Sequence, residues 1–358
     1  MQYTTNVLIG VVLCLSTAMA LPKLEIRGSK FYNTETNQQF FFKGVTYQPR
    51  TGSFAQGYDP LADKQACDRD VPVLKELGVN VIRVYETNFY LNHDYCMDML
   101  DKNGMYVLLD IPTSYKSIDR HNPSWNTELE QFFELKIQAF AHYNNVAGFI
   151  IGNEVVNSPD TIRSAKAVKQ GLRSVKSYMK AQNINIPVGY ADVDHDEIAQ
   201  YMTDYFNCSD DPNERLDFYG LNTYRWCGDA DFKTSGYDTL TNKFLSYSIP
   251  VLFTEYGCNT YLPRSFNEVS ALYSKDMNSV FSGGLVYEFT QEDNKYGLVE
   301  LVGDGAGLNI LDDFYNLKRI YGTVVDTGPA VSQKGNRTNE LNRVRSKCPT
   351  PNDFWTVD

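Results

Sequence analysis

The sequence predicts an α/β protein built as one (β/α)8 TIM barrel. Three observations support this fold. Short apolar runs rich in β-branched and aromatic residues recur along the chain, and segments with helical spacing of apolar residues lie between them. Nearly continuous apolar strands indicate parallel pairing with both faces buried. A doubly wound sheet is the alternative, but the absence of a dinucleotide-binding fingerprint after the first strand favours the closed barrel.

The elements are expected in a regular order after an N-terminal hairpin over 24–33 and 39–47. The eight barrel strands are expected at 41–47, 80–86, 105–111, 146–154, 186–193, 216–224, 250–256 and 284–289. Helices are expected at 68–77, 94–103, 127–143, 161–182, 197–206, 237–247 and 267–280, the first of them beginning at Asp68-Arg69-Asp70. Helix ends are expected just before Gly78, Gly104 and Gly148, because glycine adopts the left-handed conformation that closes a helix. The stretch 303–307 is expected to be a turn.

Residues 1–20 are predicted to be a secretory signal peptide. The apolar run 6–15 is too short to span a bilayer, and it is followed by Ala18-Met19-Ala20, an A-x-A cleavage site. A buried N-terminal helix is the alternative. The catalytic barrel is then expected over 21–326, and a C-terminal tail over 327–358 is expected to pack on it, with no cysteine-rich domain following.

The cysteines agree with secretion. Cys14 lies in the signal peptide, and six others remain: Cys67, Cys96, Cys208, Cys227, Cys258 and Cys348. An even number in a secreted chain predicts three disulfides, and the sequence alone leaves all their connectivities open. Sequons at Asn207 and Asn336 predict glycosylation. A soluble secreted protein is expected, because neither a second long apolar run nor a lipid-anchor tail is found.

The composition indicates the class of ligand. A net charge of -11 argues against nucleic acid and anionic membranes as partners, because both need a cationic surface. The chain has 25 Tyr, more than a core requires, which favours a neutral polyhydroxylated ligand bound in an aromatic cleft. No cofactor and no metal are expected, since the four His have no ligand spacing. The acidic run 192–197 could bind a cation, but a solvated loop and helix N-terminus is the preferred interpretation.

Two glutamates at strand ends are the candidate catalytic residues. The active site of such a barrel lies at the C-terminal ends of the strands, where Glu154 ends the fourth strand and Glu255 the seventh. Glycosidic bond cleavage needs one protonated and one ionised carboxyl group. Asn153 would hold a sugar hydroxyl, and Arg83 would keep a nearby carboxylate ionised. The alternative is that strand-end glutamates are solvated or paired with Lys and Arg.

Other strand-end residues complete the candidate cleft. Tyr85, Tyr224, Tyr287 and Tyr296 offer flat faces and hydroxyls to pyranose rings. Asp110 and Asp192 end the third and fifth strands and are further candidate ligands. Serine-nucleophile chemistry is not supported, because the chain has no G-x-S-x-G turn.

At these residues the chain resembles the fungal cell-wall β-1,3-glucanosyltransferases of glycoside hydrolase family 72. The matching segments run through most of the chain after residue 20 and include Gly44-Val-Thr-Tyr-Gln-Pro49, Asp59-Pro-Leu-Ala-Asp63, Cys67-Asp-Arg-Asp-Val-Pro72, Gly78-Val-Asn-Val-Ile-Arg-Val-Tyr85, Gly152-Asn-Glu-Val-Val-Asn157, Trp226-Cys-Gly228, Thr254-Glu-Tyr-Gly-Cys-Asn259 and Gly283-Gly-Leu-Val-Tyr-Glu288. Together these motifs are far more specific than a generic barrel pattern.

The resemblance implies a barrel of the retaining-glycosidase clan, a mechanism and a set of site residues. Glu154 would be the acid/base and Glu255 the nucleophile of a retaining double displacement. The positions that would line the glucan cleft are Gln48, Tyr85, Asp110, Asn153, Tyr224, Tyr287 and Tyr296. The disulfides would pair as Cys67–Cys96, Cys208–Cys348 and Cys227–Cys258. The enzyme would cleave a β-1,3-glucan donor internally and transfer the new reducing end to the non-reducing 3-hydroxyl of an acceptor chain.

The resemblance also implies a secreted monomer at the cell surface or wall, where many relatives carry a further cysteine-rich domain, a Ser-rich stretch and a lipid anchor. Residues 86–90 and Arg225 depart from the commoner family pattern, which bears on subsite preference. A hydrolytic β-1,3-glucanase is the near alternative, since the covalent intermediate is the same. A non-catalytic glucan-binding wall protein is the third.

Overall fold

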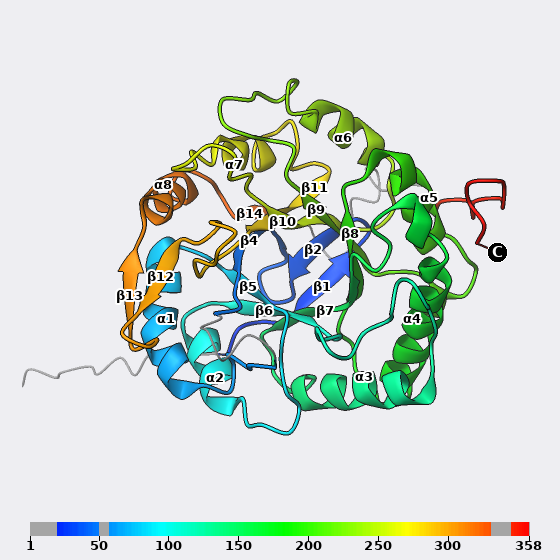
Figure 1. Ribbon diagram of the computed structural model, residues 1–358, viewed down its shortest axis with the longest axis horizontal. Helices are drawn as coiled ribbons and strands as arrows, with labels where there is room; N and C mark the ends of the chain where they lie inside the picture. Colours follow the sequence, from blue (N-terminus) through cyan, green and yellow to red (C-terminus); the bar gives the residue numbers. More distant parts are fainter. Residues whose placement is uncertain (1–19, 50–56, 331–344, 358) are drawn as a thin grey trace, which may run out of the picture.

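Eight strands form a closed parallel barrel, as the sequence predicts (Figure 1). The structure is a computed structural model that describes residues 20–49, 57–330 and 345–357. Around the barrel the order is β10-β11-β4-β5-β6-β7-β8-β9. These strands are β4 (Phe42–Thr46), β5 (Val81–Val84), β6 (Tyr106–Asp110), β7 (Val146–Asn153), β8 (Val188–Val193), β9 (Phe218–Thr223), β10 (Val251–Tyr256) and β11 (Phe281–Val286). The expected signal peptide up to residue 19, and Asn336, lie outside the described residues.

Helices surround the barrel and pack on the outer faces of its strands (Figure 1). They are α1 (Lys64–Leu77), α2 (Asp94–Lys102), α3 (Thr127–Phe140), α4 (Ser164–Ala181), α5 (Asp196–Asn207), α6 (Tyr237–Phe244), α7 (Asn267–Leu272) and α8 (Asp312–Tyr321). Helix α1 illustrates their boundaries. The side chain of Asp63 accepts hydrogen bonds from the amides of Gln65 and Ala66, and Gly78 ends the helix at φ 80°.

A small antiparallel sheet covers the N-terminal end of the barrel. Its order is β1 (Leu24–Arg27), β2 (Lys30–Asn33), β3 (Gln38–Phe40) and β14 (Thr327–Ala330). Phe31 of β2 packs edge-on against Phe42 and Phe218, whose ring centroids lie 4.8 and 5.8 Å away. Because Phe42 and Phe218 begin β4 and β9, the sheet covers the end of the barrel opposite the candidate site.

Several boundaries differ from the sequence prediction. The last barrel strand, β11, begins three residues earlier than expected, at Phe281, because its core-facing positions include small residues rather than a clear apolar pattern. Helix α1 begins at Lys64 instead of Asp68, because Asp63 provides the N-cap. Gly148 does not end a helix. It lies inside β7, where an added Cβ would be 3.0 Å from the ring of Phe218.

The C-terminal third contains the other differences. Helix α7 ends at Leu272, well before the expected residue 280, and the sequence pattern did not indicate α8. Strands β12 (Val299–Val302) and β13 (Gly307–Ile310) form a hairpin around the predicted turn, where Gly303 has φ 59°. Within the described ranges, no helix has the length and apolar character needed to cross a membrane.

The described part of the C-terminal tail contacts the barrel at helix α5. Trp355 is fully buried and stacks on Tyr201, with ring centroids 5.3 Å apart. The disulfide Cys208–Cys348 joins the end of α5 to the tail, and Cys67–Cys96 and Cys227–Cys258 are also formed. The three bonds have the pairing that the resemblance implied.

Candidate active site

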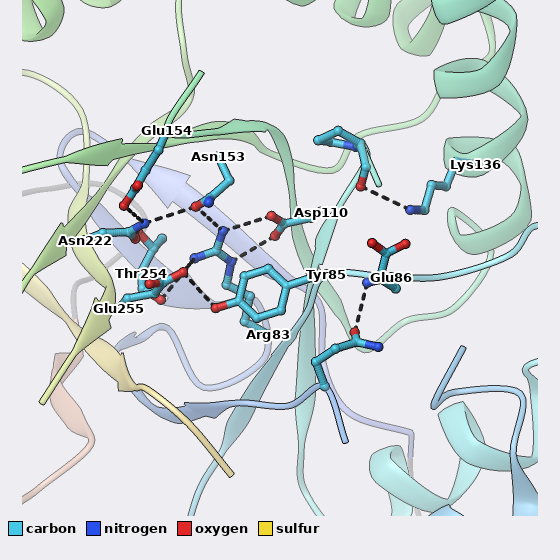
Figure 2. A network of polar contacts seen from close by, with 12 residues as sticks. Arg83, Tyr85, Glu86, Asp110, Lys136, Asn153, Glu154, Asn222, Thr254 and Glu255 are labelled. Atoms are coloured by element: carbon cyan, nitrogen blue, oxygen red, sulfur yellow. Dashed lines mark hydrogen bonds and ion pairs between the residues drawn. The ribbon is translucent and has the colours of Figure 1, made fainter. Parts of the chain in front are cut away.

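A cleft of about 370 Å³ opens at the C-terminal ends of the barrel strands. Six of the candidate residues line it: Tyr85, Asp110, Asn153, Glu154, Glu255 and Tyr287. Glu154 follows directly after β7, and Glu255 lies within β10, so the two carboxylates come from strands separated by β8 and β9. Figure 2 shows both side chains at the same end of the barrel, joined by one network of polar contacts.

Three donors hold Glu255 in position. Its Oε1 accepts hydrogen bonds from Arg83 at 3.1 Å and from the Tyr85 hydroxyl at 2.8 Å (Figure 2). Its Oε2 accepts one from the Tyr224 hydroxyl at 2.9 Å. Burial raises the pKa of the Glu255 carboxyl, and Arg83 opposes that rise. An ionised carboxylate can accept all three bonds, so this environment suits a carboxylate in the anionic form.

Arg83 is the centre of the network. It has no exposed surface, and its guanidinium forms a bidentate pair with Asp110 in which both N···O distances are 2.9 Å. The same group also donates to Asn153 Oδ1 at 2.9 Å. One buried cation therefore connects the ends of β6, β7 and β10 and fixes the side chains that they carry.

Glu154 has a different environment. Its Oε1 accepts a hydrogen bond of 2.8 Å from Asn222 Nδ2, and no ion pair to it is found among the described residues. Its backbone has φ 47°, a left-handed conformation that a residue other than glycine rarely adopts. Such conformations occur preferentially at functional sites. Glu154 is thus held by a neutral donor, whereas Glu255 faces a cation.

The orientation of the Asn153 amide follows from its neighbours. Its Oδ1 accepts from both Arg83 at 2.9 Å and Asn222 at 3.0 Å. The amide NH2 is therefore the group available to the cleft, where it can donate a hydrogen bond to a hydroxyl oxygen. Asn222 is itself oriented by Thr254, whose hydroxyl donates to its Oδ1 at 2.7 Å.

Three tyrosines form an aromatic wall beside Glu255. Tyr224, Tyr287 and Tyr296 contact one another edge-on, with centroid separations of 5.2 to 6.4 Å. The buried Arg264 donates to the carbonyl oxygens of both Tyr287 and Tyr296 and pairs with Asp313. The sequence analysis did not identify Arg264, because it lies in a loop rather than at a strand end.

Five predicted site residues are not among those that line the cleft: Gln48, Arg83, Asp192, Tyr224 and Tyr296. Gln48 is buried, and its amide accepts from the backbone N–H of Glu86 at 2.9 Å and donates to the carbonyl of Tyr58 at 3.0 Å. Gln48 therefore fixes the backbone of Glu86, which itself lines the cleft. Asp192 is fully buried and accepts a hydrogen bond from the Tyr219 hydroxyl. Burial raises the pKa of Asp192 to about 8.

Strand geometry explains the position of Asp192. Side chains alternate between the two faces of a strand, so Asp192 shares a face with Tyr190, two residues earlier. Tyr190 packs in the layer between barrel and helices, whereas Ala191 packs in the barrel interior. Asp192 therefore points away from the cleft and is not among the residues that line it.

Two other sequence features have structural explanations. The acidic run is partly neutralised by Arg225, which bonds to Asp194 and Asp196. The sequon residue Asn207 is 1% exposed, and its Oδ1 accepts from Ser248 at 3.1 Å. A glycan needs an exposed amide nitrogen, so the folded structure argues against glycosylation at Asn207.

The site also contains residues, lining the cleft or bonded to those that do, to which the sequence analysis assigned no role. Asn222 and Glu288 end strands or follow them closely, so the strand-end rule could have found them. Glu86, Thr113 and Ser114 line the cleft from loops, and no motif identified them.

The closed barrel and the two carboxylates in the cleft at its C-terminal end are those of a glycosidase-type enzyme. Comparisons with known proteins specify the family. The family model described as glucanosyltransferase, glycoside hydrolase family 72, matches residues 13–325. The chain therefore belongs to this family.

Individual relatives agree. The chain is 43% identical over 338 residues to the 1,3-beta-glucanosyltransferase GAS5 of Saccharomyces cerevisiae, an alignment that covers 93% of this chain and 68% of that protein. It is 41% identical to the 1,3-beta-glucanosyltransferase PGA4 of Candida albicans, covering 96% and 74%. The solved structure of S. cerevisiae Gas2p in complex with laminaripentaose has a TM-score of 0.87 and 40% identity, covering 94% of this chain and 76% of that one.

Proposed function

We propose that this protein is a β-1,3-glucanosyltransferase that cleaves a β-1,3-glucan chain internally and elongates another by a retaining double displacement. The observation that carries the proposal is the difference between the two carboxylates: Glu255 is held by a cation and two phenols, and Glu154 by one neutral amide. Membership of a glucanosyltransferase family supports the reaction class. The laminaripentaose named in the Gas2p complex supports the substrate class.

In the first half of the reaction, Glu154 donates its proton to the glycosidic oxygen while Glu255 attacks the anomeric carbon. The C–O bond to the leaving chain breaks, and an ester bond between the sugar and Glu255 forms. Tyr85 and Tyr224 orient the attacking oxygens, and burial raises the pKa of both phenols, so that they remain donors. The NH2 of Asn153 is placed to bond the sugar hydroxyl beside the anomeric carbon.

In the second half, Glu154 is ionised and acts as the base. It takes the proton from the 3-hydroxyl at the non-reducing end of an acceptor chain, whose oxygen then attacks the anomeric carbon and releases Glu255. If water attacks in place of the acceptor, the enzyme is a hydrolase. A bound acceptor competes with water at about 55 M only because aromatic subsites position its hydroxyl, and we assign that task to the wall of Tyr224, Tyr287 and Tyr296.

The localisation follows from the substrate. We propose a secreted protein that acts on the cell wall as a monomer, with glucan donor and acceptor chains as its partners and without a cofactor or metal. The predicted signal peptide and the disulfides support secretion.

The roles of the two carboxylates are tested with Glu154→Gln and Glu255→Gln on two donors, a laminari-oligosaccharide and an aryl β-glucoside that carries a good leaving group. Neither variant should turn over the oligosaccharide. On the aryl donor, Glu154→Gln should still release the aryl group in a burst, because that leaving group needs no proton. Glu255→Gln should release none, while its binding of oligosaccharide persists. A burst from Glu255→Gln, or none from Glu154→Gln, would contradict the assignment.

A further inference from the structure

The cleft continues outward along the loop after β6. Pro112, Thr113, Ser114, Ser117 and Ile118 all line it. Tyr115 lies between these residues in the sequence, and 56% of its surface is exposed. The loop after β5 runs alongside and carries Tyr90, which is 83% exposed. This end of the cleft therefore has two large exposed aromatic side chains beyond the residues that the mechanism uses.

The exposed rings belong to one cluster. Phe89 contacts Tyr90 with centroids 4.4 Å apart and packs edge-on against Phe132 of helix α3 at 5.4 Å. Tyr115 contacts the same Phe132 edge-on at 6.3 Å. Aromatic residues of two loops thus contact the same ring, that of Phe132 on helix α3. We call Phe89, Tyr90 and Tyr115 the aromatic platform.

The backbone beneath the platform is held by specific bonds. Thr113 and Lys116 exchange backbone hydrogen bonds of 3.0 and 3.3 Å, which close a tight turn with Tyr115 inside it. Glu86 Oε1 accepts from the backbone N–H of Ser114 at 2.7 Å and so ties this turn to the end of β5. Lys136, one helical turn after Phe132, donates to the Pro112 carbonyl (Figure 2).

Glu86 also provides a polar group between the platform and the catalytic carboxylates. Its side chain lines the cleft and is 4% exposed, and its Oε2 has no hydrogen-bond partner among the described residues. A buried carboxylate oxygen without a partner costs free energy unless a ligand or water supplies a donor. A sugar hydroxyl is such a donor.

We propose that the aromatic platform is a distal glucan subsite, on which pyranose rings stack when a chain extends beyond the catalytic centre on this side, and that Glu86 accepts a hydroxyl bond between platform and centre. The platform makes the enzyme selective for long chains. This inference rests on the proposed function, because it assigns the substrate to the same cleft. The apolar face of a pyranose covers exposed aromatic carbon, while its hydroxyls remain in water.

A neutral polysaccharide fits this surface better than a protein partner. Ser114 and Ser117, which lie on either side of Tyr115 in the sequence, line the cleft and are exposed, so their hydroxyls can bond a sugar next to the platform. A protein partner that docked here would block the cleft, so it would appear as an inhibitor of turnover on substrates of every length.

The test compares kcat/KM for reduced laminari-oligosaccharides from tetraose to decaose in the wild type and in a Tyr90→Ala/Tyr115→Ala variant. The kcat/KM of the variant should fall roughly 10-fold or more on the longest substrates, the size expected for one or two stacking contacts, and should not change on the shortest. Tyr90→Phe/Tyr115→Phe keeps the rings and should retain length selectivity. Tyr315→Ala is the matched control, because Tyr315 is 55% exposed on helix α8, away from the cleft.

Calorimetric titration with laminari-decaose separates failure of the platform from failure of the proposed function. If the wild type binds decaose without turning it over, the proposed function is wrong, and weaker binding by the alanine variant still supports the platform. An alanine variant that loses activity equally at all lengths, or that binds and converts decaose like the wild type, overturns the proposal.

Discussion

Glu255 accepts hydrogen bonds from Arg83, Tyr85 and Tyr224, whereas Glu154 accepts one from Asn222. The two carboxyl groups are chemically identical, so the different roles that we propose for them must come from these neighbours. The sequence predicted both glutamates because each lies at the end of a barrel strand. It could not predict that Asn222 donates a hydrogen bond to Glu154. Glu154 and Asn222 lie on different strands, and only the closed barrel brings their side chains together.

Asp192 shows that a position at the end of a strand does not determine which way the side chain points. The position was predicted correctly as the end of a strand, but its side chain faces the helices. Whether the last residue of a strand faces inward or outward depends on register, and a shift of one residue reverses it.

The buried Asp192 has a consequence for stability. Its folded pKa is raised to about 8, above the unfolded value of about 3.9. Between these values the folded state holds a proton that the unfolded state releases, so the free energy of unfolding falls as pH rises from about 4 to 8. Asp192→Asn cannot titrate and should lose less stability over this range.

Urea unfolding at several pH values measures this effect. The stability of Asp192→Asn relative to the wild type should increase from pH 5 to pH 8. The exposed Asp276→Asn controls for the loss of one negative charge. A constant difference between Asp192→Asn and the wild type across this range would show that Asp192 is ionised when buried.

At the scale of elements, the sequence predicted all eight barrel strands because their apolar runs are nearly continuous. Boundaries differ from the prediction where a side chain outside the apolar pattern decides them, as the N-cap Asp63 does for α1. Helix α8 follows the β12–β13 hairpin and begins with Asp312 and Asp313, so it lacks a long apolar pattern. The aromatic platform was not predicted either, because its rings come from two loops and a helix.

The tail is the element whose attachment can be tested most simply. Cys208 and Cys348 are 140 residues apart, and the loop they close constrains the unfolded chain. Cys208→Ala/Cys348→Ala should lower the free energy of unfolding by about 2–5 kcal/mol and leave kcat on short oligosaccharides unchanged, because the bond lies beside α5 and not in the cleft.

Thermal and urea denaturation measure the stability, and initial rates measure the activity. The shorter Cys67–Cys96 loop, with a separation of 29 residues, provides the comparison. Removing the Cys67–Cys96 disulfide should lower the free energy of unfolding by less, because a shorter loop restricts the unfolded chain less. A tail disulfide whose loss costs nothing would indicate that packing of Trp355 alone attaches the tail.

At the scale of the whole molecule, the two ends of the barrel have different tasks. The N-terminal sheet covers one end, where its Phe31 packs against Phe42 and Phe218 of the barrel strands, so the interior is closed there. The other end carries the cleft, which is lined by Glu154, Glu255 and Tyr287 and by the residues on either side of Tyr115 of the aromatic platform. A cleft that is open at the surface admits the middle of a polymer, which internal cleavage of a glucan requires.

Sizing the products formed from reduced laminari-oligosaccharides of one length tests the central claim most directly. Chromatography or mass spectrometry should show products longer than the substrate together with matching shorter ones, because the sugar held on Glu255 is transferred to a second chain. Products that are only shorter than the substrate would make the enzyme a hydrolase, and unchanged substrate with measurable binding would make it a glucan-binding protein. Either result would contradict the account.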